Sequence, residues 1–454
     1  MEPAMDPSLA TFLTALAGVL ALLCLWRSHA ANRHYRLIEA LPTSRTQGVF
    51  IGLVELKGTA EGDPFISYLT GQECILYRWS VSEEWRRVVT ETYRDHQGRT
   101  QTRQRVESGW TTLASGGESR PFYLQDETGA VLVHPDGADV RPFQLMSERV
   151  TAIDPLYYGK GPAGNIMNST GVRQFVEEGI PNHAEVFIVG QSRERADVVA
   201  AEVAAAPGAP LYLVTTEAEA QVLRRYGRSR DGLGLVGLGL AASCGYGIGV
   251  LTGIATPPWL AAAAAGLYLA FWAATWVWML FNSLVDVRNR VRQGWSLIEV
   301  QLKRRHDLIP PLVAAVDGLR VHEKEVTEAV TALRGQQEAT PPGQPGPALH
   351  GTAGQLAVLV ERYPVLKTND AFLRLQHSLS ETEQRLALAR DYFNDITTAY
   401  NTRLEVFPDS LLARLFGFRA QPLLDAEDFE RAPVPWHAPP VPSAPGGRPP
   451  LATA

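Results

Sequence analysis

Residues Trp259–Leu302 read WLAAAAAGLYLAFWAATWVWMLFNSLVDVRNRVRQGWSLIEVQL and combine two kinds of helix pattern. Its first part, Trp259–Phe281, contains no charged residue and is long enough to cross the hydrocarbon core of a bilayer. Its second part carries apolar residues at steps of three and four, with arginines between them, which is typical of an amphipathic helix. No proline separates the two parts, so we expect one continuous helix that leaves the membrane as a rod.

Two earlier stretches also predict membrane spans. Leu9–Trp26 holds 18 uncharged residues, and a cleaved signal peptide is the alternative interpretation. The residues before it include Glu2 and Asp6 but no Lys or Arg, and this favours a retained anchor over a signal peptide.

Leu233–Ile254 has 22 uncharged residues, more than a buried helix of a soluble protein needs. Three of its glycines, spaced as in GxxxG, would let another membrane helix approach closely. They are Gly245, Gly249 and Gly253. Only Ala255–Pro258 separates this span from the next, so we expect the two to form an antiparallel helical hairpin.

Basic residues flank each predicted span on one side only. They are Arg27, Arg33 and Arg36 after the first span, Arg224, Arg225, Arg228 and Arg230 before the second, and Arg288, Arg290 and Arg292 after the third. The positive-inside rule then predicts an N-terminus outside the cell and two large cytoplasmic regions.

The composition excludes several function classes. Of 454 residues, 45% are hydrophobic and 20% charged, with a net charge of -6, which argues against a disordered polyelectrolyte and a basic nucleic-acid binder. Three cysteines, Cys24, Cys74 and Cys244, cannot by themselves form a disulfide framework or a four-ligand zinc site. We expect no metal, no cofactor and no nucleic-acid partner.

Residues 36–230 show the alternation of β-strands. Ile75, Tyr77, Trp79 and Val81 alternate with less apolar neighbours, as in a half-buried strand. Further short strands are expected at 48–56, 121–125, 130–134, 184–189 and 211–215, and together they predict a small barrel or sandwich. The arginine-rich part of this region, 83–109, indicates either a surface for an anionic lipid or acidic partner, or a solvated hairpin, which its interspersed acids favour.

This β-rich region resembles the GIDE-type domain. The resemblance rests on PFISYLTGQECILYRWSVSEEW (64–85), FYLQDETGAVLVHPDGADV (122–140), EEGIPNHAEVFIVGQ and PLYLVTTEAE, in that order. It implies a membrane-adjacent module between two membrane helices of a mitochondrial E3 ubiquitin ligase. In that family a RING finger carries the ligase activity, and a RING needs eight Cys or His ligands. With three cysteines in this chain, we expect no ubiquitin transfer.

Residues 282–425 predict an antiparallel helical bundle with coiled-coil-like packing. We expect Pro310 and Pro311 to end or kink the first helix, a second helix to reach Leu333, a short helix at 356–361, and a long helix at 369–405. The expected bundle core is Leu284, Val291, Trp295, Ile298, Leu302, Leu379, Leu386, Phe393, Ile396 and Tyr400. The proline-rich tail, 432–454, is expected to be disordered.

This helical region resembles the LemA family. The resemblance rests on FNSLVDVRNRVRQGWSLIEVQLKRRHDLIPPLV, HEKEVTEAVTALR and SETEQRLALARDYFNDITTAYNTRLEVFPDSLLARLFGF, and the insert at 341–347 departs from the family pattern. It implies a membrane-anchored helical bundle of undefined molecular activity. Joined to a GIDE-type domain, it implies a multi-pass α+β protein of the bacterial inner membrane.

Candidate chemistry is sparse in the sequence. Arg304, Arg305, His306 and Asp307 suggest a phosphate site or a base with its orienting acid, but a polar rim at a helix end is the simpler interpretation. His322 lacks the second histidine of an HExxH motif, because Val326 stands in its place. We therefore expect a non-enzymatic membrane scaffold whose protein partner is unknown, a membrane protease or chaperone being one class. The alternatives are a ubiquitin-ligase-like role and a structural homo-oligomer.

The basic flanks generate a test of topology. Reporter fusions at Gly117 and at the C-terminus should both report the cytoplasm, because all three sets of arginines lie on one side of the predicted spans. Periplasmic alkaline phosphatase activity from either fusion would contradict this orientation.

Overall fold

The computed structural model describes residues 7–94, 100–195, 201–253, 257–318 and 370–424. The chain divides into two compact units. The helical unit comprises Met1–Pro42 and Ser229–Ala454, and the β unit comprises Thr43–Arg228. Each unit is described separately below.

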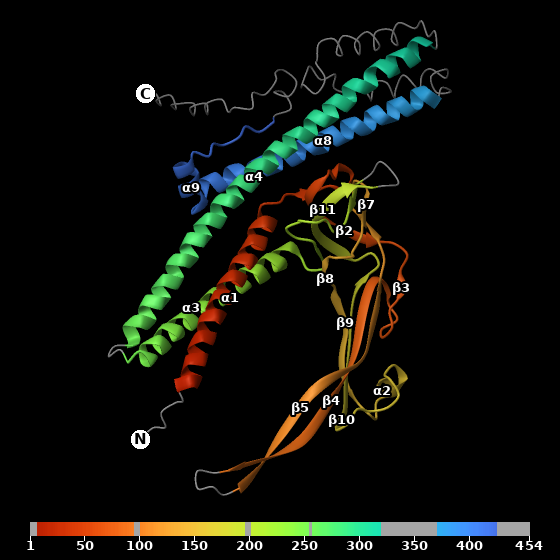
Figure 1. The fold of residues 1–454 in the computed structure, drawn as a ribbon. Helices are drawn as coiled ribbons and strands as arrows, with labels where there is room; N and C mark the ends of the chain where they lie inside the picture. Colours follow the sequence, from red (N-terminus) through yellow and green to blue (C-terminus); the bar gives the residue numbers. More distant parts are fainter. Residues whose placement is uncertain (1–6, 95–99, 196–200, 254–256, 319–369, 425–454) are drawn as a thin grey trace, which may run out of the picture. The chain divides into compact units, whose positions relative to one another are not determined.

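Three helices are long and apolar enough to cross a membrane: α1 (Pro7–Glu39), α3 (Glu219–Leu251) and α4 (Pro257–Gly318). Helix α4 continues from its apolar part into the amphipathic part without interruption, as the sequence predicts, and it is the long green helix of Figure 1. Of the two expected effects of Pro310 and Pro311, a helix end or a kink, the first is wrong, because α4 extends to Gly318. Ile309 and Leu312 are buried on either side of the prolines, and this packing outweighs the backbone hydrogen bonds that proline removes.

Helix α8 (Asp370–Glu405) lies along α4 (Figure 1). The rings of Trp295 and Phe393 meet edge to face with their centroids 5.8 Å apart, and nearer the membrane Arg403 donates a hydrogen bond to Ser283. Residue numbers therefore rise along one helix as they fall along the other, so the pair is antiparallel. The second and third helices of the predicted bundle lie in 319–369, outside the described residues.

The predicted core positions lie mainly at the α4–α8 contact. All but Trp295, which is half-buried, are buried. The buried residues are Leu284, Val291, Ile298 and Leu302 on α4 and Leu379, Leu386, Phe393, Ile396 and Tyr400 on α8.

Glycines set the close approach of the membrane helices, but not at every predicted position. A Cβ on Gly245 would collide with the backbone of Leu260, and Gly249 is buried. The prediction of a close helix approach is wrong for Gly253. This residue follows the end of α3, is exposed and has φ +67°, and a Cβ there would meet nothing within 4 Å. Its role is in the turn, where only glycine adopts this conformation without strain.

Two glycines outside the GxxxG pattern make equally close contacts. A Cβ on Gly237 would collide with Tyr268, and one on Gly247 would collide with Thr14. The GxxxG spacing alone therefore does not identify the faces at which these helices meet.

Five strands of the β unit close into a ring. They are β2 (Gly52–Glu61), β6 (Phe122–Gln125), β7 (Ala130–Val133), β12 (Ala201–Val203) and β11 (Glu185–Glu194). The ring closes because β2 pairs with β11 as well as with β6, and this matches the expected small barrel. Apolar side chains such as Leu56, Val133 and Ile188 fill its interior with no exposed surface. Strands β1 (Thr43–Ser44), β13 (Leu213–Thr215) and β8 (Asp139–Arg141) extend the sheet, and the 3-10 turn η1 (Thr46–Gly48) precedes β2.

A second sheet contains a long two-stranded ribbon. Its strands are β3 (Phe65–Ile66), β4 (Glu73–Arg94), β10 (Ser169–Pro181) and β9 (Phe143–Thr151), and β5 (Thr100–Ser119) pairs with β4 to form the ribbon. The short helix α2 (Pro155–Gly159) precedes β10. The expected hairpin is therefore present, and its tip at 95–99 lies outside the described residues.

A fully buried ion pair holds the loop after α2 against this second sheet. Arg173 Nε donates to Glu83 at 3.0 Å, while its other nitrogens donate to the carbonyls of Tyr157, Pro162 and Gly164 at 2.6–2.9 Å. Because partners satisfy both charged groups, the pair specifies the loop conformation instead of leaving a charge uncompensated. We interpret it as structural.

We predict that α8 depends on its buried stripe. Leu386 is 3% exposed, so Leu386→Asp places a carboxylate in the apolar contact and should cost about 3–5 kcal/mol. Gln384 is exposed on the same helix, and Gln384→Asp should cost under about 1 kcal/mol. Hydrogen exchange of α8 in the full chain measures the difference. Equal protection in the two variants would show that the stripe is not part of a stable core.

Candidate functional site

Four helices of the helical unit meet at one buried carboxylate, Asp409. It is the first residue of the short helix α9 (Asp409–Phe416), which follows Pro408. A carboxylate suits the first turn of a helix, where backbone N–H groups are unpaired and the helix dipole is positive. Asp409 nevertheless has only 3% of its surface exposed, so this carboxylate needs partners from elsewhere.

Two arginines supply those partners. Arg403 of α8 donates from Nε to Asp409 Oδ2 at 2.6 Å, and Arg36 of α1 approaches both carboxylate oxygens at 3.5 Å. The second arm of Arg403 donates to Ser283 Oγ of α4 at 2.9 Å. These four residues, which we call the Asp409 junction, tie α1, α4, α8 and α9 together.

The Asp409 junction stabilises the helical unit mainly because removal of Asp409 or of one arginine would leave an unpaired buried charge. Two guanidinium groups flank one carboxylate in a site from which water is largely excluded. Removing one partner of such a buried pair costs about 3–5 kcal/mol, because an uncompensated charge remains. The arrangement therefore fixes the end of α8 and the start of α9 to α1 and α4.

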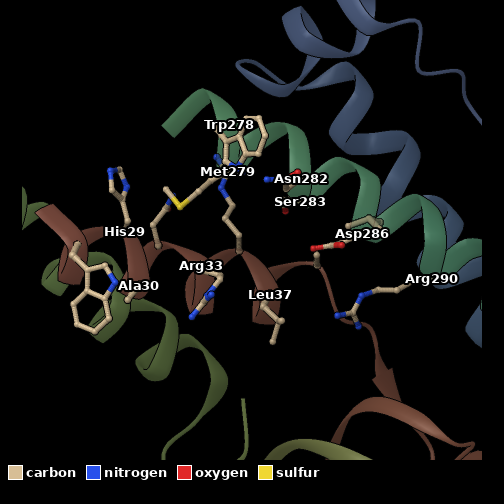
Figure 2. A pocket seen from close by; sticks show the side chains of 15 residues that line it. His29, Ala30, Arg33, Leu37, Trp278, Met279, Asn282, Ser283, Asp286 and Arg290 are labelled. Atoms are coloured by element: carbon tan, nitrogen blue, oxygen red, sulfur yellow. The ribbon is translucent and has the colours of Figure 1, made fainter. Parts of the chain in front are cut away.

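A pocket of about 330 Å³ adjoins the Asp409 junction between α1 and α4 (Figure 2). Trp26 and Trp278 line its end toward the predicted spans, and tryptophan favours the membrane–water interface. Arg33, Arg36 and Arg290 line it together with a single acid, Asp286. An apolar end and a basic end suit an amphiphile with an anionic head, such as an acidic lipid.

The polar residues of this pocket do not form a catalytic triad. Ser283, His29 and Asp286 all line it, but Ser283 Oγ accepts from Arg403, and His29 Nε2 lies 2.5 Å from the hydroxyl of Thr275. A serine nucleophile needs its hydroxyl directed at a basic nitrogen that a third group orients. The geometry of the described residues supports binding at this pocket and not acyl transfer.

The cluster Arg304–Asp307 does not converge on a ligand. Four consecutive helical residues point about 100° apart, and in α4 they spread around the helix. Arg305 is buried at 9% exposure near Glu383 of α8, whereas Asp307 is exposed.

The Asp409 junction was not predicted from the sequence. Its only local signal is an acid at a helix start after Pro408, and that pattern occurs at many helix ends. Nothing in the sequence pairs residue 36 with residue 409.

Glu55 on β2 is a buried titratable group of the β unit, with 1% of its surface exposed. Burial raises the pKa of Glu55 to about 7, although Thr43 donates a hydrogen bond to Oε1 at 2.8 Å and Lys57 Nζ lies 3.5 Å away. Among the described residues, Oε2 has no hydrogen-bond partner. Both observations favour the protonated acid at neutral pH or below.

Two family models match parts of the chain. The model of the LemA family matches residues 294–435, and the model named GIDE, described as E3 ubiquitin ligase, matches residues 90–249. The LemA match begins within α4, after its apolar part, and the GIDE match extends from the β unit into α3.

The similar curated proteins include a LemA protein and two MamQ proteins. Protein LemA of Metamycoplasma hominis is 23% identical over 158 residues, which are 34% of this chain and 72% of that protein. Magnetosome protein MamQ of Magnetospirillum gryphiswaldense is 24% identical over 171 residues, covering 31% of this chain and 63% of the relative. MamQ 1 of Paramagnetospirillum magneticum is 32% identical over 81 residues, which cover 18% of this chain and 28% of that protein. The similarity thus spans less than two thirds of either MamQ protein.

We predict that Glu55 makes the β unit less stable as pH rises. Between its ordinary value of 4.5 and its folded value of about 7, the folded state keeps a proton that the unfolded state loses. The free energy of unfolding should fall by about 3 kcal/mol across this window and stay level above it. Urea midpoints at a series of pH values, followed by proteolysis of the β unit, measure the fall.

Glu55→Gln should remove this pH dependence, because the amide does not titrate. Glu185→Gln, at an exposed position of β11, is the matched control and should retain it. A wild-type profile without this fall would contradict the raised pKa.

Proposed function

We propose that this chain, which carries a GIDE domain followed by a LemA-family domain, is a non-enzymatic membrane scaffold. In this proposal, membrane helices hold the LemA-family domain at a fixed angle to the bilayer, where its surface receives a protein partner. The partner class that we favour is a membrane protein of the same bilayer, such as a protease or chaperone. The GIDE domain supplies a second, membrane-adjacent surface.

The Asp409 junction is the observation that carries this proposal. A tethered enzyme needs only a linker, whereas a scaffold needs its surfaces at defined positions. Here the continuous α4 and the buried contacts of Asp409 with Arg36 and Arg403 remove the freedom between the membrane helices and the LemA-family helices. Rigid attachment of this kind is what presentation of a surface requires.

Orientation and location complete the proposal. The arginine flanks support a bacterial inner-membrane protein with three spans, an external N-terminus and both domains in the cytoplasm. The MamQ and LemA relatives are bacterial proteins, and this supports the bacterial part of the assignment.

Ubiquitin-ligase-like activity is the alternative that the GIDE description raises. No group of three or more His, Cys, Asp or Glu that could hold a metal occurs in the part of the chain that the structure describes, and the whole sequence has three cysteines. A RING finger needs eight such ligands, so we consider this function the weaker one. A structural homo-oligomer is the remaining alternative.

The test uses the full chain purified from its native membrane after mild cross-linking. We expect a partner at constant stoichiometry, and its yield should fall at least about fivefold with Asp409→Asn. The reason is that a less rigid attachment should weaken the free energy of partner binding by about 1 kcal/mol or more, which changes occupancy by that factor. Asp391→Asn, on the exposed face of α8, carries the same charge change and should leave the yield unchanged.

Three other outcomes would overturn the scaffold proposal. Ubiquitin chains that depend on this protein, in a reaction with activating and conjugating enzymes, would establish the ligase alternative. A cross-linked product that contains only copies of this chain would establish the oligomer. Equal partner yield from the Asp409 and Asp391 variants would show that rigid attachment is not needed.

A further inference from the structure

A second pocket, of about 190 Å³, lies on another side of α4, facing α8 and the chain that follows α9. We call it the arginine pocket. Arg288 and Arg292 of α4 and Arg419 after α9 line it, together with Tyr400 of α8. None of its lining residues is acidic. In this it differs from the pocket between α1 and α4, where Asp286 and the paired Arg36 balance part of the charge.

The wall that carries Arg419 is held in place by side chains. Gly417 has φ +69° and ends α9, so the chain turns back along α8. Asn401 then makes two hydrogen bonds with the backbone of Gln421, at 2.7 and 2.8 Å, and Asn394 makes the same pair with Leu424, at 2.9 and 2.8 Å. These asparagines lie seven residues apart on one face of α8 and fix the returning segment. The position of the segment that carries Arg419 in the arginine pocket is therefore fixed by the fold.

Two buried donors at the arginine pocket have no partner among the described residues. Tyr400 has no exposed surface, and its hydroxyl makes no hydrogen bond. Nε of Arg288 is likewise buried and unpaired, while the guanidinium of Arg288 lies 5.2 Å from the ring centroid of Phe418. Buried donors without acceptors are costly, so such groups usually serve a ligand or water. A guanidinium donates and does not accept, so the ligand must supply acceptor oxygens.

We propose that the arginine pocket binds a phosphate group. Three positive charges without a carboxylate favour an anion, and the planar fork of arginine matches the oxygens of phosphate. The hydroxyl of Tyr400 adds a donor at the buried end. The proposal stands on these contacts and is independent of the scaffold function.

Two sources of phosphate can reach the arginine pocket. Arg288 follows the end of the third predicted span, Phe281, by seven residues, which is about 10 Å along a helix. The headgroup layer is roughly 5–8 Å thick on each side of the hydrocarbon core. The pocket therefore lies at the outer edge of this layer, accessible to a lipid phosphate and to a soluble phosphate.

The test uses the full chain in detergent and in nanodiscs. In detergent, titration with inorganic phosphate should saturate, as followed by phosphorus NMR line broadening. Arg419→Gln and Tyr400→Phe should each weaken binding about tenfold, the effect of losing one charge-assisted or buried hydrogen bond. Arg414→Gln is the matched control, because Arg414 is an exposed arginine of α9 outside the pocket lining, and it should bind as the wild type does.

In nanodiscs, hydrogen exchange compares phosphatidylglycerol with digalactosyldiacylglycerol, a lipid whose headgroup has no phosphate. Protection of 288–292 and 417–421 by phosphatidylglycerol, lost in Arg419→Gln but not in Arg414→Gln, would identify the lipid headgroup as the source. Saturable binding of inorganic phosphate with no difference between the two lipids would identify a soluble phosphate. Absence of both effects, or equal losses in the Arg419 and Arg414 variants, would overturn the proposal.

Discussion

The buried carboxylate of Asp409 is the constraint on which the helical unit depends. It lies between Arg403 and Arg36, and Arg403 also reaches Ser283, so one short set of polar contacts joins four helices. Apolar packing can slide by small steps, but a buried charge tolerates only positions where its partners reach it. The junction therefore sets the register in which α8 and α9 meet α1 and α4.

Helix α4 transmits that register along its length. It passes from an apolar membrane segment into the contact with α8, and two prolines do not end it. A helix is stiff over this distance, so the direction in which α4 crosses the bilayer determines where the α8 contact and the arginine pocket lie. The same continuity makes a rigid platform a better description of this unit than a tethered domain.

The two units solve different problems of burial. The β unit closes a ring of five strands around an apolar interior and thereby removes the exposed edges of those strands. The helical unit keeps polar groups at its helix junctions, where arginines meet an acid at Asp409 and meet none among the lining residues of the arginine pocket. The paired arginines at Asp409 are structural. The arginines of the arginine pocket leave donors for a ligand, so phosphate recognition is proposed at that pocket.

Although residues 36–39 and 219–230 belong to α1 and α3, the amino-acid sequence alone predicted the three apolar spans, the continuity of α4, the β character of most of residues 36–230 and both family resemblances. Each of these follows from local composition or from a repeating pattern, which a linear reading of residues contains. It did not predict that α4 continues past Pro310 and Pro311 to Gly318, because buried neighbours there outweigh the local cost of proline. Gly253 was misassigned for a related reason, since the GxxxG spacing does not show where the helix ends.

Only the tertiary structure decided the sites. Arg36 and Asp409 are separated by more than 370 residues, and the arginine pocket joins residues of α4, α8 and the segment after α9. Charged residues on amphipathic helices look alike in sequence whether they are solvated, paired or directed into a pocket. Their role depends on which distant helix packs against them, and packing is a property of the folded chain.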